Sequence, residues 1–176
     1  MQSIHTKMIY YLAKIGKKLG FKIYVGQREQ TEEFRGVKLS ELCSEDSPTL
    51  RFTPLEKLER IKQIDVIWYK DGEVKYEFEV ENTTSITEAI VRGSNILTET
   101  TKRFIVIPKE RENLLYKRLQ EPIFSEKSKR DKWNFMFYND VEELFFMKKI
   151  KIEDINKIKR IPRLKTEEQK TLIDYS

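Results

Sequence analysis

The feature that most constrains the fold is a pair of β-rich segments joined by an Asp-Gly turn, between Ile64 and Asn82. The turn, from Lys70 to Glu73, holds the dipeptide that most favours a two-residue hairpin. The second segment alternates apolar and acidic residues, so its two sets of side chains lie on opposite faces of a strand. The pattern predicts two antiparallel strands, over 61–69 and 74–82.

The other elements predict an α/β fold with a mixed β-sheet flanked by helices. Right-handed crossover through a helix that begins at Ser85 would place the apolar run 103–108 beside the strand 74–82, in parallel. The stretch 27–52 is irregular and polar and predicts a long loop. The remaining predicted elements are helices over 3–19 and 110–119, strands over 21–26 and 133–138, and a last helix capped by Asp140.

Three glutamates, Glu77, Glu79 and Glu81, share one face of the strand 74–82. Their carboxylates repel one another unless water screens them or a cation lies between them. A solvated outer face of an amphipathic strand is one interpretation. The other is a metal site, because Asp65 lies across the hairpin from Glu79, and residues on adjacent strands can share a face. Asp65 with Glu79 and Glu81 would supply the hard oxygen ligands that Mg²⁺ prefers.

Composition excludes several other classes of protein. The single cysteine, Cys43, rules out an internal disulfide and a cysteine-based zinc cluster. No apolar run approaches the roughly 20 residues that span a bilayer, and no secretory signal is present. A cytoplasmic protein without membrane contact is therefore expected. The single histidine, His5, shares the apolar face of the first helix, and both a catalytic role and a buried, hydrogen-bonded role fit it.

The net charge of +5 is concentrated near the C-terminus. Residues 147–165 hold eight Lys or Arg against two acidic residues. A basic segment beside a nearly neutral body indicates a polyanion partner such as nucleic acid, although a solvated tail explains it as well. We expect one folded domain over 1–147, followed by a basic C-terminal tail over 148–176.

The acidic hairpin resembles the PD-(D/E)xK nuclease superfamily, whose fold is the restriction-endonuclease-like fold. In that pattern an Asp heads one strand and the (D/E)xK residues close the next, as Asp65 and Glu79-Val80-Glu81 do here. More narrowly, the chain is similar to prokaryotic restriction-endonuclease-related proteins with an IDVxW…FExExTTSI signature. The likeness is dense over 64–95 and looser over 3–147.

The resemblance implies a metal-dependent endonuclease that hydrolyses DNA phosphodiester bonds in restriction or phage defence, with Mg²⁺ as cofactor and Mn²⁺ as a substitute. Asp65 and Glu79 would bind the metal together with the Val80 carbonyl, and Asp65, Glu79 and Glu81 would be catalytic. Glu81 stands where the family pattern has lysine. It would orient or deprotonate the attacking water, or hold a second metal.

Several alternatives stay open. A shifted register would pair Glu77 with Glu79 and leave Glu81 solvated. Glu81 in the lysine position also fits a catalytically inactive, nuclease-fold module that binds nucleic acid or scaffolds a larger assembly. The family analogy implies a homodimer on DNA, with other defence proteins as further partners. Arg92 and the basic loop 127–132 are candidate phosphate contacts, and nothing in the sequence separates DNA from RNA.

Overall fold

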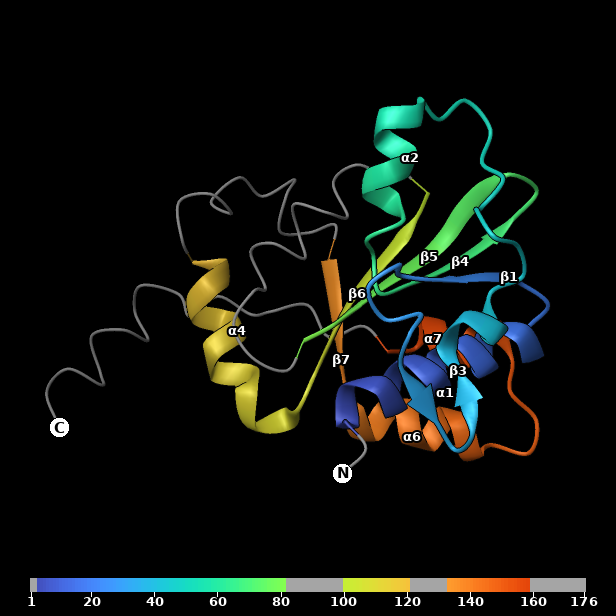
Figure 1. Cartoon of the computed structure of the whole chain (residues 1–176). Helices are drawn as coiled ribbons and strands as arrows, with labels where there is room; N and C mark the ends of the chain where they lie inside the picture. Colours follow the sequence, from blue (N-terminus) through green and yellow to red (C-terminus); the bar gives the residue numbers. More distant parts are fainter. Residues whose placement is uncertain (1–2, 82–99, 121–132, 159–176) are drawn as a thin grey trace, which may run out of the picture.

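A five-stranded mixed sheet flanked by helices forms the body of the computed structural model (Figure 1), which describes residues 3–81, 100–120 and 133–158. Its strand order is β1-β4-β5-β6-β7. The first three strands of that order are antiparallel, and β5, β6 and β7 are parallel. This arrangement confirms the predicted fold class and is consistent with a restriction-endonuclease-like core. The strands are β1 Lys22–Val25, β4 Val66–Lys70, β5 Glu73–Val80, β6 Lys102–Ile107 and β7 Trp133–Phe137.

The β4–β5 hairpin forms as its sequence predicts. Asp71 and Gly72 have φ angles of 54° and 75°, the left-handed conformation that a two-residue hairpin turn needs at both central positions. Glycine adopts this conformation without strain, and aspartate tolerates it. The resulting register places Val66 opposite Phe78.

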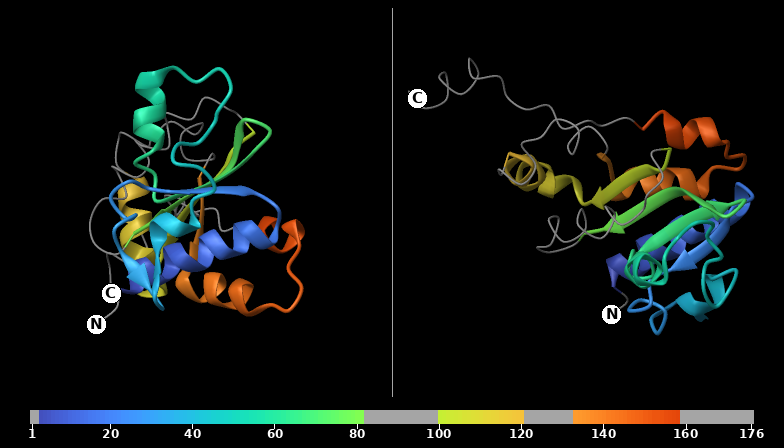
Figure 2. Two further views of the ribbon diagram at one scale, coloured as in Figure 1. Left: turned by 45° about the vertical axis from the view of Figure 1, so that its right-hand side comes forward. Right: turned by 90° about the horizontal axis from the view of Figure 1, so that it is seen from above.

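Helices cover both faces of the sheet (Figures 1 and 2). Below the sheet in Figure 1, α1 (Ile4–Lys18) and α6 (Tyr138–Phe146) lie side by side, next to α7 (Ile152–Asn156). Their apolar residues join those of the strands in the largest core cluster. On the other face, α4 (Glu112–Leu119) packs on β6 and β7, and α2 (Leu55–Ile61) contributes Ile61 to a third cluster with β1 and β4.

Three local predictions are wrong. The segment before Val66 is not a strand, because α2 ends at Ile61 and a short turn separates the helix from β4. The long loop contains a small hairpin, β2 (Glu33–Phe34) with β3 (Val37–Lys38), and the 3-10 helix η1 (Leu39–Leu42), whose apolar side chains are buried. Finally, the last strand ends at Phe137 and not at Tyr138, and α6 begins at Tyr138. Asp140 lies in the first turn of this helix, where its carboxylate accepts a hydrogen bond from the Phe137 N–H at 2.7 Å.

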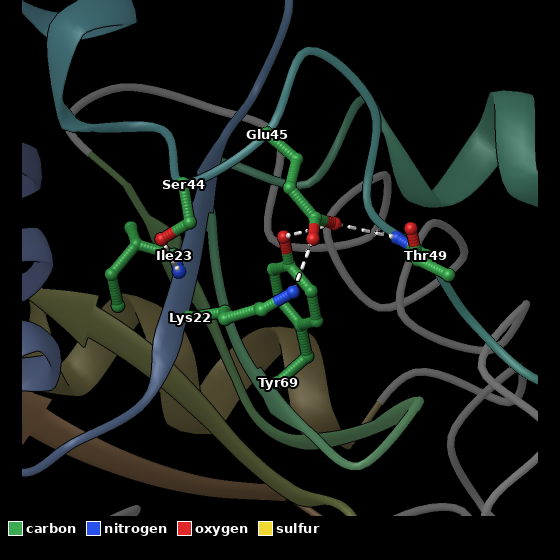
Figure 3. Close-up of polar contacts among 6 residues, drawn as sticks. All are labelled: Lys22, Ile23, Ser44, Glu45, Thr49 and Tyr69. Atoms are coloured by element: carbon green, nitrogen blue, oxygen red, sulfur yellow. Dashed lines mark hydrogen bonds and ion pairs between the residues drawn. The ribbon is translucent and has the colours of Figure 1, made fainter.

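The loop after η1 is held on the sheet by two neighbouring residues, Ser44 and Glu45 (Figure 3). The Ser44 N–H donates to the Ile23 carbonyl at 2.7 Å, and the Ser44 hydroxyl oxygen accepts from the Ile23 N–H at 2.9 Å. The second contact is the Glu45 carboxylate. It accepts hydrogen bonds from the Tyr69 hydroxyl at 3.1 Å and the Thr49 N–H at 3.2 Å, and it pairs with the Lys22 ammonium. These contacts hold the pKa of Glu45 well below its usual range, at about 2, with the Lys22 contact contributing most. Glu45 is therefore a structural anchor.

The C-terminal segment up to Ile158 packs on the body. Ile155 in α7 is buried in the largest core cluster. The Asn156 side chain accepts hydrogen bonds from Tyr76 at 2.8 Å and from Lys102 at 2.6 Å. Among the described residues, no helix is long and apolar enough to cross a membrane. The predicted Ser85 helix, Arg92 and the loop 127–132 lie outside the described residues.

Candidate functional site

Asp65 lies immediately before β4, beside the end of β5. One carboxylate oxygen, Oδ2, accepts a hydrogen bond from the Val80 N–H at 2.7 Å. The Asp65 carbonyl accepts another from the Gly26 N–H at 2.9 Å. Extending the β4–β5 register by one residue sets Asp65 opposite Glu79, as the hairpin prediction requires. The residue is almost completely buried, with 5% exposed.

Glu77 and Glu79 of β5, and Glu81 just after it, are also buried, which contradicts the solvated-face interpretation. Glu77 and Glu79 are 0% exposed, and Glu81, just after the strand, is 7% exposed. Their positions alternate with those of Tyr76, Phe78 and Val80, which face the largest core cluster. Buried carboxylates are costly unless they are paired, hydrogen-bonded or bound to a cation. A row of buried acidic side chains is therefore expected to have specific charged or hydrogen-bonding partners, or a bound cation.

Glu77 has a partner of its own. Arg103, its neighbour on β6, lies with Nε 3.5 Å from Glu77 Oε1, and both side chains are buried. Burial raises the pKa of Glu77 to about 8, and the charge of Arg103 only partly opposes this rise. The alternative register, with Glu77 and Glu79 as the functional pair, predicts a solvated Glu81, but Glu81 is buried. The burial of Glu81 contradicts that alternative on this point.

Glu81 is fixed by its backbone at the point where β5 ends. Its N–H donates to the Val106 carbonyl at 2.8 Å, which extends the parallel β5–β6 ladder by one residue. The Tyr138 hydroxyl, at the start of α6, donates to the Glu81 carbonyl at 3.0 Å. Burial and then the charge of Glu81 raise the pKa of Tyr138 to about 12, so this hydroxyl stays a hydrogen-bond donor at neutral pH.

Two further residues lie at this site and were not among the predicted site residues. His5, in the first turn of α1, has Nε2 3.6 Å from Asp65 Oδ2. Burial alone would lower the pKa of His5, but the interaction with Asp65 raises it above its ordinary value overall. Glu29, after β1, lies close enough to Asp65 that burial and then the charge of Asp65 raise its pKa to about 7. The sequence could have indicated His5, because it is the single histidine of the chain. Glu29 lies in an irregular stretch where no pattern indicates a functional residue.

The predicted metal ligands are the carboxylates of Asp65, just before β4, and of Glu79, in β5, together with the backbone carbonyl of Val80. Oxygen donors of this kind are the ligands of Mg²⁺, which keeps several waters of its own. No group of three or more His, Cys, Asp or Glu side chains within residues 3–81, 100–120 and 133–158 is placed to hold a metal ion. The carboxylates of Asp65, Glu79 and Glu81 therefore do not converge as a group of three metal ligands in the structure.

Comparison with known proteins identifies the family. The family model described as the C-terminal domain of the type II restriction enzyme NmeDI matches residues 1–160. The chain therefore belongs to this family of restriction-enzyme domains. No curated protein and no solved structure matches it.

Proposed function

We propose that this member of the NmeDI C-terminal domain family is a metal-dependent endonuclease that hydrolyses DNA phosphodiester bonds in restriction or phage defence. The observation that carries the proposal is the hydrogen bond from the Val80 N–H to Asp65, which holds one buried carboxylate beside another, Glu79, at the end of β5. The setting is a family of restriction-enzyme domains, whose substrate is DNA.

Each residue has a role under this proposal. Asp65, Glu79 and the Val80 carbonyl hold the cation, Mg²⁺ or Mn²⁺, which polarises the phosphodiester and neutralises the leaving oxygen when bound. Glu81 orients the attacking water or accepts its proton. Tyr138 fixes the Glu81 backbone and so helps position that carboxylate.

DNA contacts come from the basic side chains. Lys148, Lys149 and Lys151 are exposed just after α6, and the sequence continues with further lysines and arginines. Such residues bind phosphate without reading sequence, so they supply affinity and register on the duplex. We further propose a homodimer, because the active site of each subunit would then cut one of the two DNA strands.

The test is cleavage of plasmid and phage DNA of varied sequence in Mg²⁺ and in Mn²⁺. We expect wild type to cut and Glu79→Gln, which keeps the side chain's shape, to be slower by at least ~100-fold, because a metal ligand is lost. Glu73→Gln is the matched control, since Glu73 is an exposed glutamate at the other end of β5. Circular dichroism and melting curves check that each variant folds. Equal cleavage by the two variants would refute the assignment of Glu79.

The position of Glu81 favours a second candidate, a nuclease-fold module that binds DNA without cutting it. Glu81 cannot supply the positive charge that lysine gives at this position of the resembled pattern. Wild-type protein that shifts DNA in a gel but cuts it with neither metal would support this candidate over the endonuclease.

A further inference from the structure

The small hairpin of β2 and β3 has an arginine at a turn position where arginine is uncommon. Its two central residues, Arg35 and Gly36, have φ angles of 54° and 76°. A two-residue turn with both φ angles positive favours asparagine, aspartate or glycine at its first central position. The β4–β5 hairpin follows that rule with Asp71 and Gly72, at φ angles of 54° and 75°. The turn itself therefore gives no reason for an arginine at position 35.

The hairpin lies beside α1 and is fixed to it by one aromatic side chain (Figure 1). The Phe34 ring is buried, with its centroid 5.1 Å from that of Tyr10 and 5.9 Å from that of Tyr11. Arg35 is exposed, and its guanidinium lies 5.3 Å from the centre of the Phe34 ring. The buried ring thus holds the hairpin in place, while the arginine next to it stays accessible to a partner.

The base of the same hairpin is tied to the Asp65 site. The Thr6 hydroxyl donates to the Glu32 carboxylate, which joins the residue before β2 to the first turn of α1. His5 precedes Thr6, and its Nε2 is 3.6 Å from Asp65 Oδ2. Glu32 is three residues from Arg35, or about 10 Å of extended chain. A duplex bound at Asp65 would therefore lie within reach of the hairpin tip.

The shape and chemistry of the hairpin match those of a DNA-reading element. The major groove, roughly 12 Å wide, admits a two-stranded β-ribbon. Arginine makes the commonest specific contact there, because its planar fork donates two hydrogen bonds to the O6 and N7 atoms of guanine. The other exposed charges of the hairpin are of opposite sign, since Lys38 lies across from Glu33. Arg35 therefore supplies the net positive charge of this hairpin.

We propose that Arg35 reads the sequence of the bound DNA by hydrogen-bonding to a guanine in the major groove. This role explains the unfavourable φ angle, because backbone strain persists at positions where it places a side chain for a ligand. The inference rests on the proposed function only in that DNA is the ligand. It applies equally to a domain that cuts DNA and to one that binds DNA without cutting.

The test is selection and sequencing of the duplexes that the full chain binds from a pool with a randomised central segment. We expect wild type to select a sequence that contains guanine. Arg35→Asn and Arg35→Lys should each reduce the preference for one guanine by at least ~5-fold, since neither replacement offers the two-pronged donor. Arg35→Lys keeps the charge, so its loss of preference separates base reading from phosphate contact.

Arg51→Asn is the matched control for the selection. Arg51 is exposed, and its N–H donates to the Gly72 carbonyl at 2.8 Å, at the end of the β4–β5 hairpin that lies away from Asp65. This variant should select the same sequence as wild type.

Melting curves separate the proposed role of Arg35 from a structural one. Arg35→Asn should melt at the wild-type temperature or above it, because asparagine adopts a positive φ more readily than arginine. If Arg35 serves only to cover the Phe34 ring, this variant melts lower and keeps the guanine preference, which overturns the inference. Wild type that binds DNA without preferring guanine, or an unchanged preference in both Arg35 variants, also overturns it and leaves the proposed function standing. Wild type that binds no DNA overturns both.

Discussion

At the scale of single residues, the pairing of Glu77 with Arg103 explains how one carboxylate of the acidic row is accommodated. Both side chains are buried, and each lies on a strand that is hydrogen-bonded on both edges. At neutral pH the Glu77 carboxyl is mostly protonated, because burial raises its pKa to about 8 and the charge of Arg103 only partly opposes this rise. Its contact with Arg103 depends on the β5–β6 register, which places the two residues opposite each other.

Glu77 also makes stability depend on pH. Its pKa is about 8 in the folded protein against an ordinary value of 4.5, so between these values the folded state holds a proton that the unfolded state has released. The stability that this residue contributes is complete below about pH 4.5 and is lost as the pH rises to about 8. The free energy of unfolding of Glu77→Gln should therefore rise relative to wild type across this range, by at most about 1.4 kcal/mol per pH unit.

Urea unfolding of both proteins at pH 5, 6.5, 8 and 9 would measure this difference. Taking the difference removes the contribution of Glu29, which both proteins retain. Glu33→Gln is the control, because it makes the same substitution at an exposed residue of β2. A flat difference for Glu77→Gln would show that Arg103 keeps Glu77 ionised in the fold.

At the scale of elements, the contact of α1 with β4 fixes how the first helix crosses the sheet. The Trp68 indole N–H donates to the Leu12 carbonyl at 3.1 Å, so the ring lies directly against the helix. Gly16 permits this approach: a Cβ there would be 2.6 Å from Trp68 Nε1 and 2.5 Å from Ile23 Cδ1. The same helix places His5 beside Asp65, so packing at Gly16 influences the geometry of the site.

Gly16→Ala should destabilise the protein although alanine is the better helix former. The gain in helix propensity is about 1 kcal/mol, whereas the overpacked contact with Trp68 costs about 1–3 kcal/mol. Denaturant unfolding measures the net loss, and a red shift of tryptophan fluorescence in the folded state would report displacement of the ring. Lys17→Ala, an exposed change in the same helix, should stay within about 0.5 kcal/mol of wild type. A more stable Gly16→Ala protein would contradict this packing argument.

At the scale of the whole molecule, the core extends through most of the described chain. One cluster joins α1, the central strands, α6 and α7, so residues far apart in sequence stabilise the same fold. The sequence predicts a domain boundary at 147. We propose instead that the folded unit continues to at least residue 158, because Ile155 is buried and Asn156 bonds to Tyr76 and Lys102.

Ile155→Ala tests this boundary. If α7 is part of the folded unit, the cavity should lower the free energy of unfolding by about 2–5 kcal/mol. Ile4→Ala is the matched control, since Ile4 is 45% exposed and its truncation should cost less than about 1 kcal/mol. Equal, small effects of the two changes in denaturant unfolding would place α7 outside the cooperative unit.

Local sequence patterns were sufficient to predict the hairpin and the parallel strand beside it. These follow from local patterns, because alternation, an Asp-Gly turn and a continuous apolar run each act over a few neighbouring residues. The same patterns left open whether the acidic face met water or lay inside. A strand has the same alternating sequence whether its acidic face is solvated or buried. Only the residues that pack on that face decide between the two.

Only the tertiary structure decided what surrounds those acids. It brought Arg103 to Glu77, the first turn of α1 to Asp65, and Glu29 to the same site from an irregular stretch. Each of these contacts joins residues that are distant in sequence, so no local sequence pattern predicts it. The physical reason is that burial and charge pairing depend on how elements pack together, while secondary structure depends mostly on adjacent residues.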